Sequence, residues 1–155
     1  MAEFMGEMAD DERTGDGDLS DLLSELRILL PGAQMLTAFL IILPFNGGFA
    51  QISADEKYVY VATFLCALVS LVLFAAPAAQ HRLQRPLLDR EGFKHRANRL
   101  VVAGLLFLSL ALILATQLVL TEVLHLPWLS WGAAGGVALL VSGVWWFVPL
   151  RSRRS

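Results

Sequence analysis

Charged residues are scarce in this chain, and the shortage excludes most soluble folds. Only 17% of its 155 residues are Asp, Glu, Lys or Arg, whereas 56% are hydrophobic and the mean hydropathy is +0.60. Soluble domains are usually about 25% charged. The composition therefore predicts one small domain whose solvent is lipid.

No ionisable side chain lies near the middle of any of the long apolar runs. Ionisable groups at that depth are the usual sign of proton relay or ion transport. Their absence counts against a small four-span multidrug transporter, which depends on a carboxylate embedded in its first helix.

Residues suited to catalysis or metal binding are equally scarce. Cys66 is the one cysteine, so no disulfide can form within the chain. His81, His95 and His125 lack the spacing of metal ligands, and no Cys or Ser has an obvious base. We therefore expect no catalytic residue, metal or cofactor. The basic segment has no interleaved aromatic residues, so we expect no nucleic-acid partner.

The N-terminus lacks the positive region of a signal peptide and is strongly acidic instead. Residues 1–25 carry nine Asp or Glu and one Arg, whereas the remainder carries five acidic and eleven basic residues. Residues 1–17 have no hydrophobic periodicity, which predicts a disordered acidic tail. The alternative is a tail that docks onto a partner or onto the basic segment at 81–99.

Apolar runs long enough to cross a bilayer dominate the rest of the sequence. About 20 helical residues cover the roughly 30 Å of hydrocarbon. We predict an all-α, four-helix transmembrane bundle with a short N-terminal interfacial helix near Asp18. Pro31 either kinks a continuous first helix or separates the interfacial helix from the first span. The membrane domain is 18–150, with spans at about 26–45, 58–79, 98–120 and 127–150 and a basic tail at 151–155.

The basic residues predict the orientation. Residues 81–99 hold six of the twelve Lys and Arg, and an even number of spans places both termini on the same side as this segment. That side then carries eleven basic residues and the other only Lys57. The positive-inside rule places the side with more Lys and Arg in the cytoplasm. We therefore predict a multi-pass protein of the plasma (inner) membrane with both termini in the cytoplasm. Trp128 and Trp131 would lie at the outer interface, and Trp145 and Trp146 at the inner one.

Small residues at helical spacing predict where helices approach each other closely. In the second span these residues are Ala62, Cys66 and Ser70, and in the fourth they are Gly132 and Gly136, a GxxxG pair. The GxxxG pair could serve contact inside the bundle or association between chains.

Polar residues predicted near the cytoplasmic end form the candidate site. We expect Glu25 to pair with an arginine there, although each arginine could instead extend separately to the lipid headgroups. Gln34 and Asn98 are expected to form interhelical hydrogen bonds or, alternatively, to line a polar cavity. The complete candidate cluster is Glu25, Arg27, Gln34, His81, Arg82, Arg96, Asn98 and Arg99.

Three stretches, ELRILLPGAQMLTAFL (25–40, continuing to Pro44), APAAQHR (76–82) and ANRL (97–100), resemble a bacterial family of small four-span membrane proteins known only as a domain of unknown function. The resemblance covers residues 24–150 and implies an integral membrane protein, with no activity attached. The matching positions are Glu25, Arg27, Pro31, Gly32, Gln34, Pro44, His81, Arg82, Asn98 and Arg99.

The sequence thus predicts a non-enzymatic structural or interaction subunit of a membrane. Its expected partners are membrane lipids and either a second copy of the chain or another protein. The alternative function is a small channel or transporter built by oligomerisation. A channel needs a continuous polar path, for which the sequence offers Gln34, Thr37, Asn98, Thr116 and Gln117.

Overall fold

The computed structural model describes residues 2–83, 90–124, 126–147 and 151, with the backbone alone at 2–20, 22, 50, 90, 91 and 127. The described chain is helical, which confirms the all-α prediction, and four of its helices are long and apolar enough to cross a membrane. The elements are α1 (Ala2–Ile42), the short 3-10 helices η1 (Leu43–Phe45) and η2 (Phe49–Gln51), α2 (Ala54–Leu83), α3 (Arg90–Leu124), α4 (Pro127–Val141) and the π-helix η3 (Ser142–Phe147).

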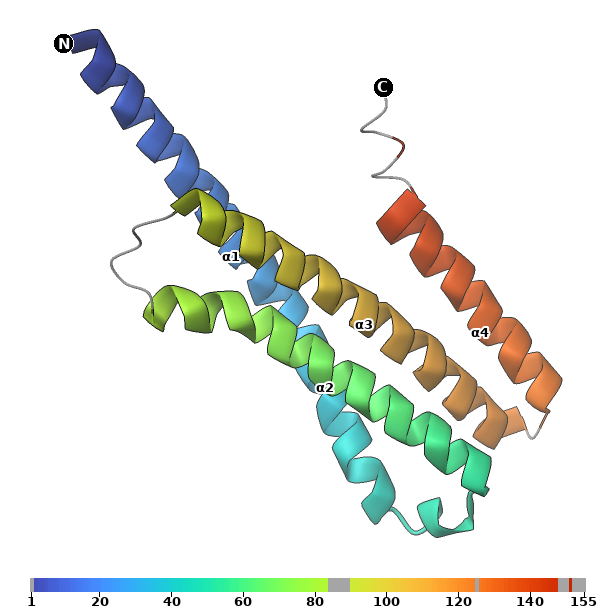
Figure 1. Ribbon diagram of the computed structural model, residues 1–155. Coiled ribbons are helices and arrows are strands. Elements are labelled where there is room, and N and C mark those ends of the chain that lie inside the picture. Colours follow the sequence, from blue (N-terminus) through green and yellow to red (C-terminus); the bar gives the residue numbers. More distant parts are fainter. Residues whose placement is uncertain (1, 84–89, 125, 148–150, 152–155) are drawn as a thin grey trace.

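Successive long helices run in opposite directions (Figure 1). The end of α2, the start of α3 and the end of η3 lie toward one end of the molecule, whereas η1, η2, the end of α3 and the start of α4 lie toward the other. This up-and-down arrangement is the one that four spans with short connections require.

The first helix differs from the expectation at its N-terminus. α1 is continuous for 41 residues and includes Pro31, so neither a separate interfacial helix nor a break at this proline occurs. Residues 2–17, for which we expected no structure, belong to the same helix. Extending an existing helix avoids the cost of nucleation, and acidic side chains are favoured near a helix N-terminus.

The second and third helices extend beyond the predicted spans at both ends. The apolar segments are Ala54–Leu83 with 30 residues and Gly92–Leu124 with 33. At 1.5 Å per residue each is about 45–50 Å long, more than the hydrocarbon requires. Their ends therefore reach the headgroup zone, where α2 carries Asp55 and Glu56 in its first turn and His81 and Arg82 in its last. This polarity complements the helix dipole.

A capping box begins α2. The Ser53 backbone N–H and hydroxyl both donate to Glu56 Oε2 at 2.8 Å, and the Glu56 N–H donates to Ser53 Oγ at 3.3 Å. These bonds satisfy backbone groups that a helix start would otherwise leave free. The prediction placed this start a turn later because it followed hydropathy alone.

The helices do not form a closed ring. α2 and α3 share the largest interface, α1 packs mainly on α2, and α4 packs on α3. Among the described residues, no Cα atoms of α1 and α4 come within 8 Å of each other. α3 is therefore the central helix, and α4 is supported from one side only.

Buried residues recur at alternating spacings of three and four along the helices. This is the spacing of coiled-coil seams, in which side chains of one helix fit between those of the next. Small residues alternate with large ones, so the backbones approach closely. On α2 the buried residues are Tyr60, Thr63, Ala67, Ser70, Phe74 and Pro77, and on α3 they include Ala97, Val101, Gly104, Leu108, Ala111 and Leu118.

Gly104 lies in close contact with Phe74 in this seam. A Cβ added at Gly104 would lie 2.6 Å from Phe74 Cε1, which is closer than real Cβ contacts occur. The Phe74 side chain is fully buried. Glycine at 104 thus makes room for the phenyl ring between α2 and α3.

Hydroxyl groups inside the bundle bond within their own helices. Thr37 Oγ1 donates to the Ala33 carbonyl at 2.7 Å, and Ser70 Oγ donates to the Ala67 carbonyl at 2.7 Å. The Tyr60 hydroxyl instead joins two helices, since it donates to the Leu40 carbonyl at 2.8 Å. The Phe49 ring meets Tyr60 edge-on at 4.9 Å between centroids. Tyr60 therefore connects α2 to the end of α1 through a hydrogen bond and to η2 through a ring contact.

Candidate functional site

The predicted polar cluster lies at the end of the bundle where α2 ends and α3 begins, but most of its side chains point outward. Glu25, Arg27, Arg82, Arg96 and Arg99 are all exposed. No ion pair of Glu25 with an arginine occurs among the described residues. This exposure fits the alternative in which the arginines extend separately to the headgroups.

His81 is the member of the cluster that packs. It is half-buried, and its ring lies 5.9 Å from the ring of Phe93, which is buried on α3. Close by along α3, Arg96 Nε donates to the Gly92 carbonyl at 3.1 Å. His81 and Phe93 thus close the α2–α3 seam at the end where α2 ends and α3 begins.

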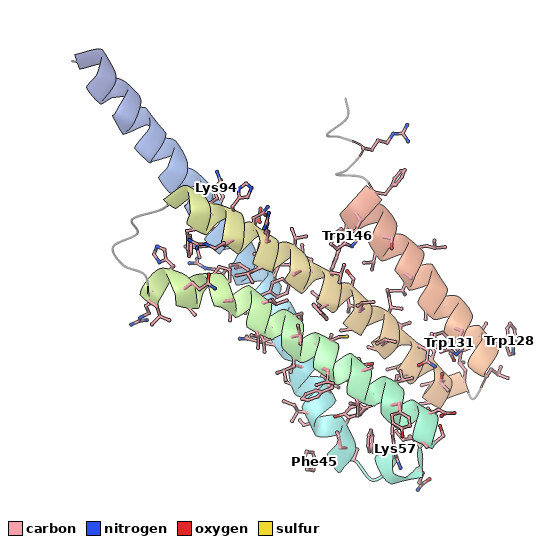
Figure 2. All side chains as sticks on the ribbon, viewed as in Figure 1. Phe45, Lys57, Lys94, Trp128, Trp131 and Trp146 are labelled. Carbon is pink, nitrogen blue, oxygen red and sulfur yellow. The ribbon has the colours of Figure 1, made fainter. Side chains whose placement is uncertain are left out.

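Figure 2 shows the labelled lysines and tryptophans toward the two ends of the molecule. Lys94 and Trp146 lie toward one end, and Lys57, Trp128 and Trp131 lie toward the opposite end. Trp128 and Trp131 are exposed, whereas Trp145 packs against the core formed around Phe74. The tryptophans at the two ends therefore differ in their surroundings.

Gln34 and Asn98 were predicted either to form interhelical hydrogen bonds or to line a polar cavity. Neither prediction anticipated the exposed positions that they occupy. Both side chains are exposed, and within the described part of the chain neither makes a hydrogen bond to another helix. Gln34 is on α1, and its neighbour on the buried side, Thr37, bonds to its own helix. Among the described residues, these amides therefore do not join two helices.

On α2, the packing face is displaced from the predicted one. Ser70 is fully buried as expected, but Ala62 is exposed and Cys66 is only half-buried. The helix instead buries Thr63 and Ala67, which share a face with Ser70. A period of four residues drifts around the helix, whereas alternating spacings of three and four keep residues facing the neighbour.

On α4, the GxxxG pair faces away from the rest of the chain. Gly132 and Gly136 are exposed, and a Cβ added at either would meet nothing within 4 Å. The side of α4 that packs on α3 carries Ser130, Ala134 and Val141, which are all buried. The predicted close contact at the glycines is therefore absent within the described chain.

Two further features lie toward the end of the bundle that holds η1, η2 and the end of α3. A cavity of about 250 Å³ opens between η1, η2 and the end of α3. Its lining surface is almost entirely apolar and includes Leu43, Phe49 and Leu118, and Glu122 also borders it. On α3, Gln117 Nε2 donates to Thr121 Oγ1 at 3.1 Å, while the buried Gln117 Oε1 has no partner. His, Cys, Asp and Glu side chains form no group of three among the described residues.

The family model of DUF6328, a family of unknown function, matches residues 9–149. The chain belongs to DUF6328. No curated protein and no solved structure matches it. The resemblance to an uncharacterised family of small four-span proteins is thus confirmed, and the match extends into the acidic N-terminal segment.

In this DUF6328 protein, the close contact that the sequence analysis missed had a readable signal. Ala97, Gly104 and Ala111 are spaced seven residues apart and are all buried on α3. A seven-residue repeat keeps small residues on one face of a helix that supercoils with its neighbour. The glycines of α4 are four residues apart, a spacing that indicates close packing without identifying the partner.

Proposed function

We propose that this DUF6328 protein is a non-enzymatic, multi-pass protein of a bacterial plasma (inner) membrane that works by associating with other membrane helices through α4. Both termini lie in the cytoplasm under this proposal, supported by the eleven basic residues on one side against Lys57 on the other. The exposed arginines at that end would contact anionic lipid headgroups.

The open glycine face of α4 is the observation that carries the proposal. α4 contacts only α3 among the long helices, and Gly132 and Gly136 point away from that contact. Glycines in an apolar helix leave a shallow groove into which another helix can pack closely. A groove that no part of the described chain fills is available to a partner.

The alternative function, a channel or transporter, receives less support from the polar side chains. Thr37 and Thr116 each donate to a carbonyl of their own helix. Gln34 and Asn98 are exposed on different helices, and Gln117 is buried beside Thr121. Within the described chain these residues do not combine into one polar path.

Photo-cross-linking in native membranes tests the proposal. A photoreactive residue at position 140 of the full chain replaces Leu140, which is 65% exposed and lies one turn after Gly136, so the groove stays open. It should attach to a protein helix, and mass spectrometry should identify that protein. The matched control is position 72 on α2, where Val72 is 60% exposed. A Gly132→Leu substitution, which fills the groove, should abolish the protein adduct.

The result that would contradict the proposal is equally clear. If position 140 captured only lipid, or captured proteins no better than position 72 does, the glycine face would not be an association surface. Gly32→Leu controls for folding, because this exposed glycine of α1 also has nothing within 4 Å of an added Cβ.

A further inference from the structure

Gln34 lies within the apolar part of the first candidate membrane span, Leu23–Phe45. It follows the exposed, charged Arg27 by seven positions, or about 10 Å at the helical rise. Its side chain is exposed and makes no hydrogen bond among the described residues. In a membrane, this amide would face hydrocarbon.

An amide at that depth cannot reach water. Along the helix, Gln34 lies about 10 Å from Arg27 and about 16 Å from Phe45, the last residue of the span. Both distances are longer than a glutamine side chain. Burying an amide without hydrogen bonds is costly, and polar side chains in membranes usually bond to another helix. Gln34 therefore requires a partner outside the chain's own described bundle.

A second copy of the chain can supply this hydrogen-bonding partner without any other protein. An amide group both donates and accepts, so two glutamines related by a two-fold axis can satisfy each other. Two copies inserted in the same direction place Gln34 at the same depth. The neighbouring position on that face, Ala38, is small and exposed and would let the two helices approach closely.

We propose that two copies of this DUF6328 protein pair in parallel through α1, with the Gln34 amides hydrogen-bonded to each other. This inference rests on the proposed function, because it assigns one of the associating partners. α1 and α4 do not touch among the described residues. The pair would therefore leave the glycine face of α4 open for a further protein.

Site-directed disulfide cross-linking tests the pairing in the full chain. Cys66→Ala removes the one cysteine, and Ala38→Cys then places a thiol next to Gln34 on the same face. Mild oxidation in native membranes should give a covalent dimer. The matched control is Phe39→Cys, since Phe39 is 75% exposed but lies about 100° further around the helix. It should give little dimer.

Gln34 itself is tested by measuring the dimer dissociation constant. Diluting labelled chains in lipid vesicles and following energy transfer gives this constant directly. Gln34→Leu should raise it about 3- to 30-fold, the loss expected for hydrogen bonds between membrane helices. Gln34→Asn keeps an amide and should retain most of the affinity.

Several outcomes would overturn the pairing. These are equal cross-linking at positions 38 and 39, an unchanged dissociation constant in Gln34→Leu, or a monomer at every lipid dilution. If position 140 still captured a protein in those membranes, the proposed function would stand and only the self-pairing would fall. Loss of both signals would remove both proposals.

Discussion

Two of the helix surfaces that carry glycine, one in the α2–α3 seam and one on α4, have opposite surroundings. In the α2–α3 seam, Gly104 lies so close to Phe74 that an added Cβ would overlap the phenyl ring. On α4, Gly132 and Gly136 face open space. The first surface holds the fold together, whereas the second contributes nothing to packing within the described chain.

The difference teaches that small residues predict close approach but do not identify the partner. Lipid tails are as apolar as the side chains that they would replace, so helices in membranes associate through van der Waals fit and hydrogen bonds. A glycine groove has the same appearance in a sequence whether its partner is the next helix or another protein. The comparison can be tested by changing each surface in turn.

Phe74→Ala should give the largest effect. The substitution empties a fully buried site between α2 and α3 and should lower the free energy of unfolding by about 2–4 kcal/mol through lost contacts and an unfilled cavity. Detergent titration in bicelles measures this loss. Phe39→Ala changes a residue that is 75% exposed and should have little effect. Equal losses in the two variants would contradict the packing described for the seam.

Gly104→Ala should lower the free energy of unfolding by an intermediate amount. It tests the comparison between the two glycine surfaces most directly. The new methyl group would lie 2.6 Å from Phe74 Cε1, and such overpacking costs about 1–3 kcal/mol. Gly132→Ala makes the same chemical change with nothing within 4 Å and should not destabilise the isolated chain. Phe74→Leu combined with Gly104→Ala should recover part of the loss. Additive losses would show that the ring and the methyl group do not clash.

Tyr60→Phe should give the smallest loss in the free energy of unfolding. It removes the 2.8 Å hydrogen bond to the Leu40 carbonyl and leaves the ring contact with Phe49, so we expect about 0.5–1.5 kcal/mol. Hydrogen exchange should increase at the end of α1. Tyr58→Phe alters an exposed tyrosine two residues away and serves as the control. A Tyr60→Phe variant as stable as this control would indicate that the bond contributes nothing to the α1–α2 contact.

Much of the fold followed from the order of apolar and charged residues. The hydropathy pattern predicted four helices, and the structure has four that could cross a membrane. Lys57 and Lys94 lie at opposite ends, as expected from alternating spans (Figure 2). The bounds were less accurate, because helices continue past the hydrocarbon wherever their backbone bonds are satisfied. The Ser53–Glu56 cap is an example.

The candidate site was less predictable, because the sequence does not say which side of a helix faces another helix. Ser70 was assigned to the packing face correctly, but Ala62 and Cys66 were not. Gln34 was expected to bond within the bundle or to line a cavity, and its side chain is exposed instead. Each error concerns rotation about a helix axis, a quantity that a period of four residues leaves uncertain.

The sequence by itself determined that this protein has four apolar helices, where they begin and end to within a turn or two, and how charge divides between their ends. These properties depend on transfer from water to an apolar phase, which each residue contributes by its own chemistry. The tertiary structure alone decided that α3 is central, that Phe74 packs over Gly104, and that Gln34 and the α4 glycines face outward. Those outcomes depend on shape complementarity between helices, which exists only once the helices have met.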